Sequence, residues 1–214
     1  REFKYLGIKI LYDRYFIRSE DKVVESPQAF WMRVAMGLAL DEEDKEAWAI
    51  QFYNLISRFK YTPSTPTLFN SGTSHAQLSS CYLNTFDDSI DGIFDGAWQE
   101  ARKSKYAGGL GLDVTPFRSS GSHIKGTNGS SSGIIPWLKI FNSLLVAVNQ
   151  GGKRPGAGCA YLEPWHLDYE DFLNLRRNTG DDRLRCHDLH TASWVPDRFM
   201  RAVIAEEKWH MFDP

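Results

Sequence analysis

The chain has 214 residues, 42% of them hydrophobic and 24% charged, and its formal net charge is -2. This length fits one domain or one large piece of a bigger protein, and the composition is that of a folded core. The near-neutral charge and the lack of an apolar run of roughly 18 residues exclude general attraction to nucleic acid and a membrane span.

The first part of the chain has a helical pattern. A Ser-Pro pair, which has the chemistry of a helix start, precedes residues 28–40, where apolar side chains recur at helical spacing. An acidic run begins a second predicted helix over 41–59. Two prolines then interrupt the pattern, so we expect 62–67 to be non-helical. We therefore divide the chain into a helical N-terminal region, 1–60, and an α/β region, 61–214.

Strand and helix patterns alternate in the second region. A long polar loop is expected at 117–132, preceded and followed by regular elements. Strands are predicted at 78–83, 108–114, 159–162 and 189–194, and helices at 90–106, 136–148, 168–175 and 196–206. This alternation indicates an α/β barrel or a doubly wound sheet.

Residues 149–158, Asn-Gln-Gly-Gly-Lys-Arg-Pro-Gly-Ala-Gly, join a predicted helix to a predicted strand. Glycines let backbone N–H groups approach a ligand, and the adjacent Lys and Arg add positive charge suited to phosphate. The spacing matches neither a P-loop nor a dinucleotide fingerprint. An anion-binding, adaptable loop and a solvated connector are both compatible with this segment.

The chain contains three cysteines at wide spacing, Cys81, Cys159 and Cys186. An odd number argues against a secreted disulfide framework, and the spacing argues against a CxxC zinc site. The N-terminus also lacks a signal-peptide pattern, so we expect a cytoplasmic protein. His187 and His190 are three residues apart on a predicted strand, where they would point to opposite faces. We interpret them, and His166, as structural histidines rather than metal ligands.

Several separated segments form an ordered set of motifs: LSSCYL at 78–83, AGGLG at 107–111, GSHIKGTNG at 121–129, QGGKRPG at 150–156, YLEPWHL at 161–167, RRNTG at 176–180 and WVPDRFM at 194–200. Together and in this order, they resemble the large catalytic subunit of ribonucleotide reductase. The resemblance covers almost the whole chain. It implies a helical N-terminal region followed by half of a ten-stranded α/β barrel. The rest of the barrel, with the Asn-x-Cys-x-Glu loop of the family, is expected C-terminal to this chain.

The resemblance implies that ribonucleotides are converted to deoxyribonucleotides by a transient thiyl radical and a pair of reducing thiols. Cys81 matches the first reducing thiol, and its partner is expected outside this chain. Thr65 and Ser80 match positions that bind the phosphate and sugar of the substrate, while Gln150 and Arg154 match contacts to its base and phosphate. The alternatives are a buried packing cysteine and a simple turn threonine. Cys159 and Cys186 match no catalytic position, and we interpret them as packing residues.

A second implied site binds an ATP or dNTP effector that selects which base is reduced. Asp88 and Ser89 match contacts to its sugar and base. The matches to its phosphate contacts are Lys105, Arg118, Lys125 and Gly126. Asp88 could equally serve as a helix cap. The glycine-rich loop would lie between the two sites, its glycines acting as hinges that couple effector to substrate.

The resemblance also implies partners. The segment is expected to hold no cofactor, to receive its radical from a metal-containing small subunit, and to be re-reduced by thioredoxin or glutaredoxin. Adenosylcobalamin is the alternative radical source. The helices at 90–106 and 136–148 are expected to form a homodimer, and the segment by itself should be inactive. A different hypothesis is a non-catalytic nucleotide-binding fragment of a split reductase.

Overall fold

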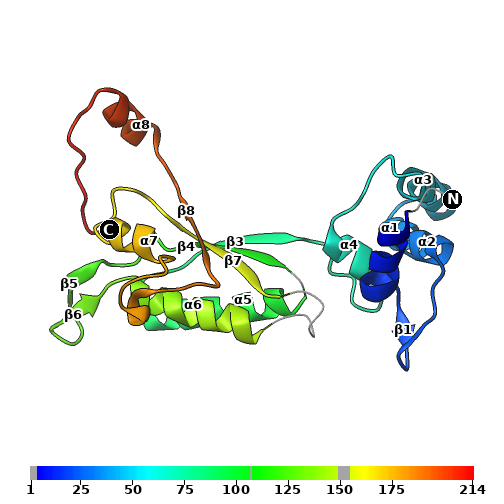
Figure 1. Cartoon of the computed structure of the whole chain (residues 1–214), viewed down its shortest axis with the longest axis horizontal. Helices are drawn as coiled ribbons and strands as arrows, with labels where there is room; N and C mark the ends of the chain where they lie inside the picture. Colours follow the sequence, from blue (N-terminus) through cyan, green and yellow to red (C-terminus); the bar gives the residue numbers. More distant parts are fainter. Residues whose placement is uncertain (1–3, 107, 149–154) are drawn as a thin grey trace. The chain divides into compact units, whose positions relative to one another are not determined.

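A computed structural model describes residues 4–106, 108–148 and 155–214. The chain divides into two compact units, residues 1–80 and 81–214, shown in Figure 1. This division lies later in the chain than the 60/61 boundary taken from the sequence. The reason is that the segment around Leu68 packs into the apolar core of the first unit.

The first unit is mainly helical. Its described elements are α1 (Tyr5–Ile10), a π-helical turn (Leu11–Tyr15), β1 (Arg18–Ser19), β2 (Lys22–Val23), α2 (Pro27–Leu38), α3 (Lys45–Ser57) and α4 (Thr65–Asn70). The two predicted helices are confirmed as α2 and α3. α3 begins later than expected, because Asp44 caps it by accepting a hydrogen bond from the N–H of Ala47 at 3.1 Å. α1 and the short β1–β2 pair were not predicted.

The prediction that 62–67 is non-helical is wrong in its second half, where α4 begins at Thr65. Pro66 lies in the first turn, where a backbone N–H would have no intrahelical partner, so proline costs the helix nothing there. Arg33 of α2 holds the other end of α4, since its Nη1 donates to the carbonyl of Ser71 at 2.6 Å. The same guanidinium pairs with Glu25 at 2.6 Å.

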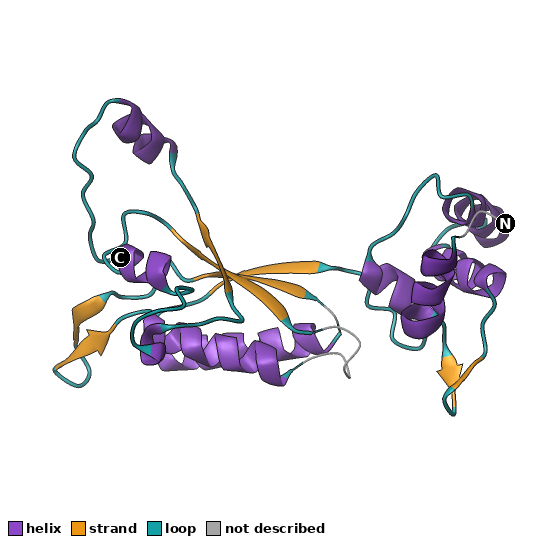
Figure 2. Cartoon of the chain, viewed as in Figure 1, coloured by secondary structure: helices purple, strands orange, loops and turns teal. Residues whose placement is uncertain are grey.

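The second unit is built on a parallel sheet of β3 (Cys81–Thr85), β4 (Gly109–Asp113), β7 (Ala157–Leu162) and β8 (His190–Ser193), in the order β3-β4-β7-β8. The helices of this unit are α5 (Ile90–Lys105), α6 (Ile135–Ala147), α7 (Tyr169–Asn174) and α8 (Asp197–Ile204), with a 3-10 turn at Asp182–Leu184. α5 and α6 lie along one face of the sheet (Figure 2). The predicted alternation of strands and helices is thereby confirmed as a mixed α/β fold.

Residues 117–132 are not an irregular loop, as predicted, but contain the antiparallel hairpin β5 (Ser120–Ile124) and β6 (Gly129–Ser132). Serine and glycine dominate both strands, so the apolar alternation that marks a strand is missing. Together, residues 120–132 form the hairpin.

The two faces of the parallel sheet differ in chemistry. Leu110, Leu112, Ala160 and Leu162 belong to the apolar core that α5 and α6 cover. Successive strand residues alternate between faces, so Cys81, Asp113 and Tyr161 lie on the opposite face. That face is where polar and reactive side chains gather. None of the described helices is long and apolar enough to cross a membrane.

Candidate functional site

Cys81 opens β3 and pairs in register with Gly109 of β4, which in turn pairs with Ala157 of β7. These neighbours are small, and Cys81 is exposed. Cys81 is therefore not a core packing residue in this structure. Its role as a reducing thiol stays a prediction.

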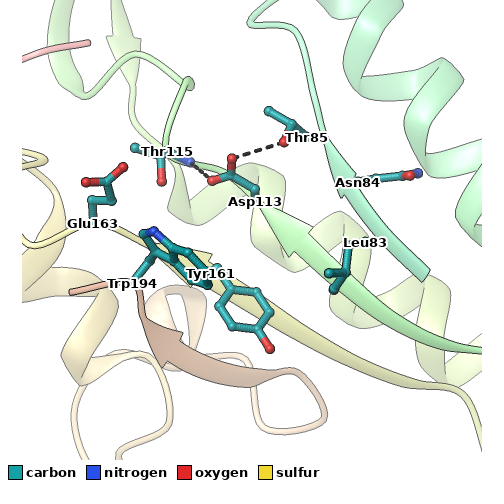
Figure 3. Close-up of a pocket in the computed structure, with 9 residues that line it drawn as sticks. Leu83, Asn84, Thr85, Asp113, Thr115, Tyr161, Glu163 and Trp194 are labelled. Atoms are coloured by element: carbon teal, nitrogen blue, oxygen red, sulfur yellow. Dashed lines mark hydrogen bonds between the residues drawn. The ribbon is translucent and has the colours of Figure 1, made fainter. Parts of the chain in front are cut away.

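A cavity of about 290 Å³ lies farther along the same face, toward the carboxyl ends of the strands (Figure 3). Asp113 lines it, and its carboxylate accepts hydrogen bonds from Thr85 Oγ1 and from the N–H of Thr115, each at 3.1 Å. Glu163 also lines it, accepting from Trp165 Nε1 at 2.7 Å. Ligands of parallel α/β sheets commonly bind at this edge. Polar residues directly following apolar strand residues were the sequence signal for this cavity, and sequence analysis missed it.

Tyr161 and Trp194 form an aromatic wall of this cavity, with ring centroids 6.5 Å apart and an edge-to-face angle of 76° (Figure 3). Cys159 lies two residues before Tyr161 on the same face and is half-buried. Burial raises the pKa of the Cys159 thiol, and the neighbouring Cys159 raises the pKa of Tyr161. Both groups are therefore protonated at neutral pH. Because Cys159 is only half-buried, the interpretation of this residue as a packing residue is not confirmed.

A second cavity, of about 440 Å³, lies between the hairpin and the start of α5. Asp88, Arg118, Lys125 and Gly126 all line it, so most of the residues matched to the effector site come together. Arg118 Nε contacts Asp88 Oδ2 at 2.5 Å, and its Nη2 donates to the Asp88 carbonyl at 3.2 Å. The cavity thus places two cations, Arg118 and Lys125, beside the carboxylates of Asp88 and Asp213, and guanidinium and ammonium groups are the usual protein partners of phosphate.

The cap of α5 is Ser89, whose Oγ accepts from the N–H of Gly92 at 3.0 Å. The alternative that Asp88 serves merely as a helix cap is therefore wrong. Lys105 ends the same helix, and the 16 residues of α5 span about 24 Å at 1.5 Å per residue. Within one chain, Lys105 does not line the cavity that contains Asp88.

Four residues were matched to the substrate site. Two of them, Gln150 and Arg154, lie outside the described residues. Thr65 and Ser80 belong to the first unit, where Thr65 Oγ1 hydrogen-bonds the hydroxyl of Tyr15 at 3.2 Å.

Gly156 is one of the loop glycines expected to act as hinges, and close packing explains why a glycine is needed there. A Cβ added to Gly156 would come within 2.3 Å of the carbonyl oxygen of Leu145. Gly156 therefore lets the start of β7 pass close to the end of α6. Of the other loop glycines, Gly158 lies within β7, and Gly151 and Gly152 lie outside the described residues.

The structural interpretation holds for the buried histidine His166, whose two ring nitrogens both have hydrogen-bond partners. His190 lies on β8, but His187 precedes the strand, so the expectation that both lie on one strand is wrong. Among the described residues, no three His, Cys, Asp or Glu side chains gather as a metal site. Cys186 is a core residue, and burial raises its pKa to about 11, which confirms its packing interpretation.

A parallel sheet backed by helices, with an exposed thiol on its open face and a separate polar cavity beside the hairpin, defines a mixed α/β protein. The family comparison is more specific. Residues 1–76 match the all-alpha domain of ribonucleotide reductase, and residues 79–214 match its barrel domain. The chain therefore belongs to the ribonucleotide reductase large-subunit family.

Individual relatives agree. The chain is 59% identical over 213 residues to the ribonucleoside-diphosphate reductase subunit alpha of Chlamydia muridarum, covering 100% of this chain and 20% of the relative. It is 47% identical to the subunit alpha of Helicobacter pylori strain J99, covering 100% of this chain and 27% of the relative. It is also 47% identical to the large subunit of variola virus, covering 99% and 27%. The chain thus spans about a fifth to a quarter of the length of these curated relatives.

Proposed function

We propose that this chain is a segment of a ribonucleoside-diphosphate reductase large subunit and takes part in converting ribonucleotides to deoxyribonucleotides. The observation that carries the proposal is the likeness to such subunits along the full chain. The exposed Cys81 on the polar face of the sheet supports it, since a reducing thiol must reach its substrate.

The reaction replaces the 2′-hydroxyl of the ribose by hydrogen and releases water. Two thiols supply the two electrons and two protons, and they end as a disulfide. Cys81 is the proposed first thiol, with its partner on a segment outside this chain. Thioredoxin or glutaredoxin then reduces the disulfide. A transient thiyl radical starts the reaction, and a metal-containing small subunit supplies the oxidising equivalent.

We further propose that the remainder of the barrel covers the face of the sheet that carries Cys81 and Asp113. Polar and reactive side chains gather on this face, whereas the opposite face is already buried beneath α5 and α6. The remainder would bring the partner thiol and the radical cysteine to Cys81. By this account the segment needs its complement for activity.

A reconstitution assay tests this function. The chain is mixed with the C-terminal remainder of a related large subunit, a small subunit and thioredoxin, and dCDP formation from CDP is measured. Turnover is expected in the mixture and not with either part alone. Cys81→Ser should abolish thioredoxin-dependent turnover, while Cys159→Ser, a matched control on the same face, should retain it.

The outcomes separate the hypotheses. Turnover that needs adenosylcobalamin in place of the small subunit would assign the radical to the alternative source. Nucleotide binding without reduction under either condition would favour the non-catalytic fragment and refute the reductase. Equal loss in both cysteine variants would show that Cys81 has no special role.

For the cavity beside the hairpin, we propose binding of an ATP or dNTP effector. Arg118 and Lys125 would contact its phosphates, and Asp88 its sugar. Arg118→Ala should weaken dTTP binding by roughly 1.5–3 kcal/mol, about 10- to 150-fold, as expected for a lost charge-assisted contact. Arg177→Ala, an exposed arginine after α7, serves as the control in the same calorimetric titration. Equal affinity of the two variants would contradict the assignment.

The proposed homodimer accounts for Lys105. Ile90, Phe94 and Trp98 recur every four residues on α5 and are 68%, 51% and 61% exposed, so they form an apolar stripe. Two copies of α5 pairing antiparallel about a two-fold axis would bury both stripes. The same pairing carries Lys105 of one copy toward Ser89 of the other. Each effector site would then take residues from both copies.

A further inference from the structure

The two ends of the hairpin are joined by the buried carboxylate of Asp168. Its Oδ1 accepts from the N–H of Ser120 at 2.9 Å, where β5 begins, and its Oδ2 accepts from the N–H of Ile134 at 3.0 Å, just after β6. Asp168 is 6% exposed. The two oxygens of one carboxylate can accept several hydrogen bonds, so this contact ties both ends of the hairpin to one side chain.

Asp168 is itself held by His166, which is fully buried. The N–H of Asp168 donates to His166 Nδ1 at 3.0 Å, so that nitrogen carries no proton. His166 Nε2 must then carry the proton, which it donates to the carbonyl of Phe117 at 2.7 Å. The histidine thus links Asp168 to the residue that directly precedes Arg118.

A second carboxylate, that of Asp213, accepts hydrogen bonds from the start of the hairpin and from the residue before it. Its Oδ1 accepts from the N–H and Oγ of Ser119 at 2.7 and 2.6 Å, and from Ser122 Oγ at 2.5 Å. Phe212 positions Asp213 by stacking on Trp165, with ring centroids 4.6 Å apart and an angle of 11°. The N–H of Phe212 also donates to the Trp165 carbonyl at 2.8 Å.

From these contacts we infer that Asp168 and Asp213 are positioning residues that clamp the base of the hairpin and preset Arg118 and Lys125 for an anionic nucleotide. Asp213 holds Ser119, which directly follows Arg118, and lines the same cavity as both cations. Lys125 lies just beyond β5, so the orientation of the hairpin sets its place. This inference deepens the proposed effector function and rests on it for the identity of the ligand.

The clamp should act on affinity through the fraction of chains whose hairpin is already in the binding orientation. The apparent Kd rises in inverse proportion to that fraction. If the loss of Asp213 lowers the fraction to about a tenth, the Kd rises about tenfold. A residue that merely stabilises the fold would lower the unfolding midpoint without this selective loss of affinity.

The test compares Asp213→Ala, Asp213→Asn and the control Asp197→Ala in the full chain. Asp197 is exposed at the start of α8, which lies well apart from the hairpin in Figure 1. Calorimetry measures the Kd for dTTP with Mg²⁺, and hydrogen exchange measures protection of residues 120–132. We expect Asp213→Ala to raise the Kd about tenfold and to deprotect the hairpin. Asp213→Asn, whose amide oxygen accepts the same hydrogen bonds, should restore most of both.

Unchanged protection and an unchanged Kd in Asp213→Ala would overturn the clamp, as would an equal loss in the control. If the unaltered chain binds no dTTP, the effector proposal fails, and the hydrogen-exchange comparison still decides whether the clamp exists. Asp168→Asn provides a second variant, in which deprotection of Ser120 and Ile134 with intact protection of β4 and β7 supports the clamp. Uniform deprotection of the whole second unit would contradict a local role for Asp168.

Discussion

Gly133→Ala should destabilise the second unit by about 2.5–5 kcal/mol, as the sum of two costs. Gly133 has a φ of +74°, and an alanine in this left-handed conformation costs about 1–2 kcal/mol. An added Cβ would also lie 2.3 Å from Asp168 Oδ2 and 2.9 Å from the N–H nitrogen of Ser120. Relieving that overlap breaks at least one hydrogen bond to the carboxylate, which costs about 1.5–3 kcal/mol.

Two glycines within the hairpin separate these costs. Gly121 has a φ of +85° and nothing within 4 Å of an added Cβ, so Gly121→Ala should cost only about 1–2 kcal/mol. Gly126 has open space and no positive φ, so Gly126→Ala should change the stability by no more than about 0.5 kcal/mol.

Urea unfolding followed by tryptophan fluorescence gives the free energy of unfolding of each variant from its midpoint and slope. The difference between the alanine variants at positions 133 and 121 isolates the contact with Asp168, about 1.5–3 kcal/mol. If those two variants are equally stable, Asp168 does not tie the ends of the hairpin as the structure indicates, and the reasoning is refuted.

The remaining predictions concern thiols, acid pH and assembly. Iodoacetamide should label Cys81 well before Cys186, which is 1% exposed and whose pKa burial raises to about 11; equal rates by mass spectrometry would contradict this. Burial acts to raise the pKa of Asp213, but hydrogen bonds from Ser119 and Ser122 hold it below 3.8. A lowered pKa stabilises the fold above the unfolded value and loses that effect as the pH falls through the folded one. The difference in urea midpoint between the unaltered chain and Asp213→Ala should therefore shrink from about pH 6 to about pH 3, and a constant difference would count against it. Trp98→Glu should convert a dimer into a monomer in sedimentation velocity, and an unchanged coefficient would exclude the α5 interface.

Much of the regular structure follows from local pattern. The patterns at 90–106 and 108–114 predicted the helix α5 and the strand β4. These signals depend on neighbours within a few residues, so they can be read without knowing the fold. α4 was missed because the helix-breaking rule for proline was applied to a residue that lies in the first turn, where the rule does not hold.

The hairpin and its clamp show the limit of such reasoning. No apolar alternation marks residues 120–132, and the carboxylates that accept hydrogen bonds at their ends are distant in sequence. Ser119 and Asp213 are 94 positions apart, and Ser120 and Asp168 are 48 apart. A hydrogen bond between such residues depends on where the parallel sheet places α7 and the segment after α8.

The order of motifs was enough to establish the family, and local periodicity was enough to place most strands and helices of the second unit. The grouping of Asp88, Arg118 and Lys125 around one cavity, and the separation of Lys105 from them, required the folded chain. The physical reason is range: helix caps and strand alternation act over a few residues, whereas a binding cavity is assembled from side chains that meet only after the sheet and its helices have packed.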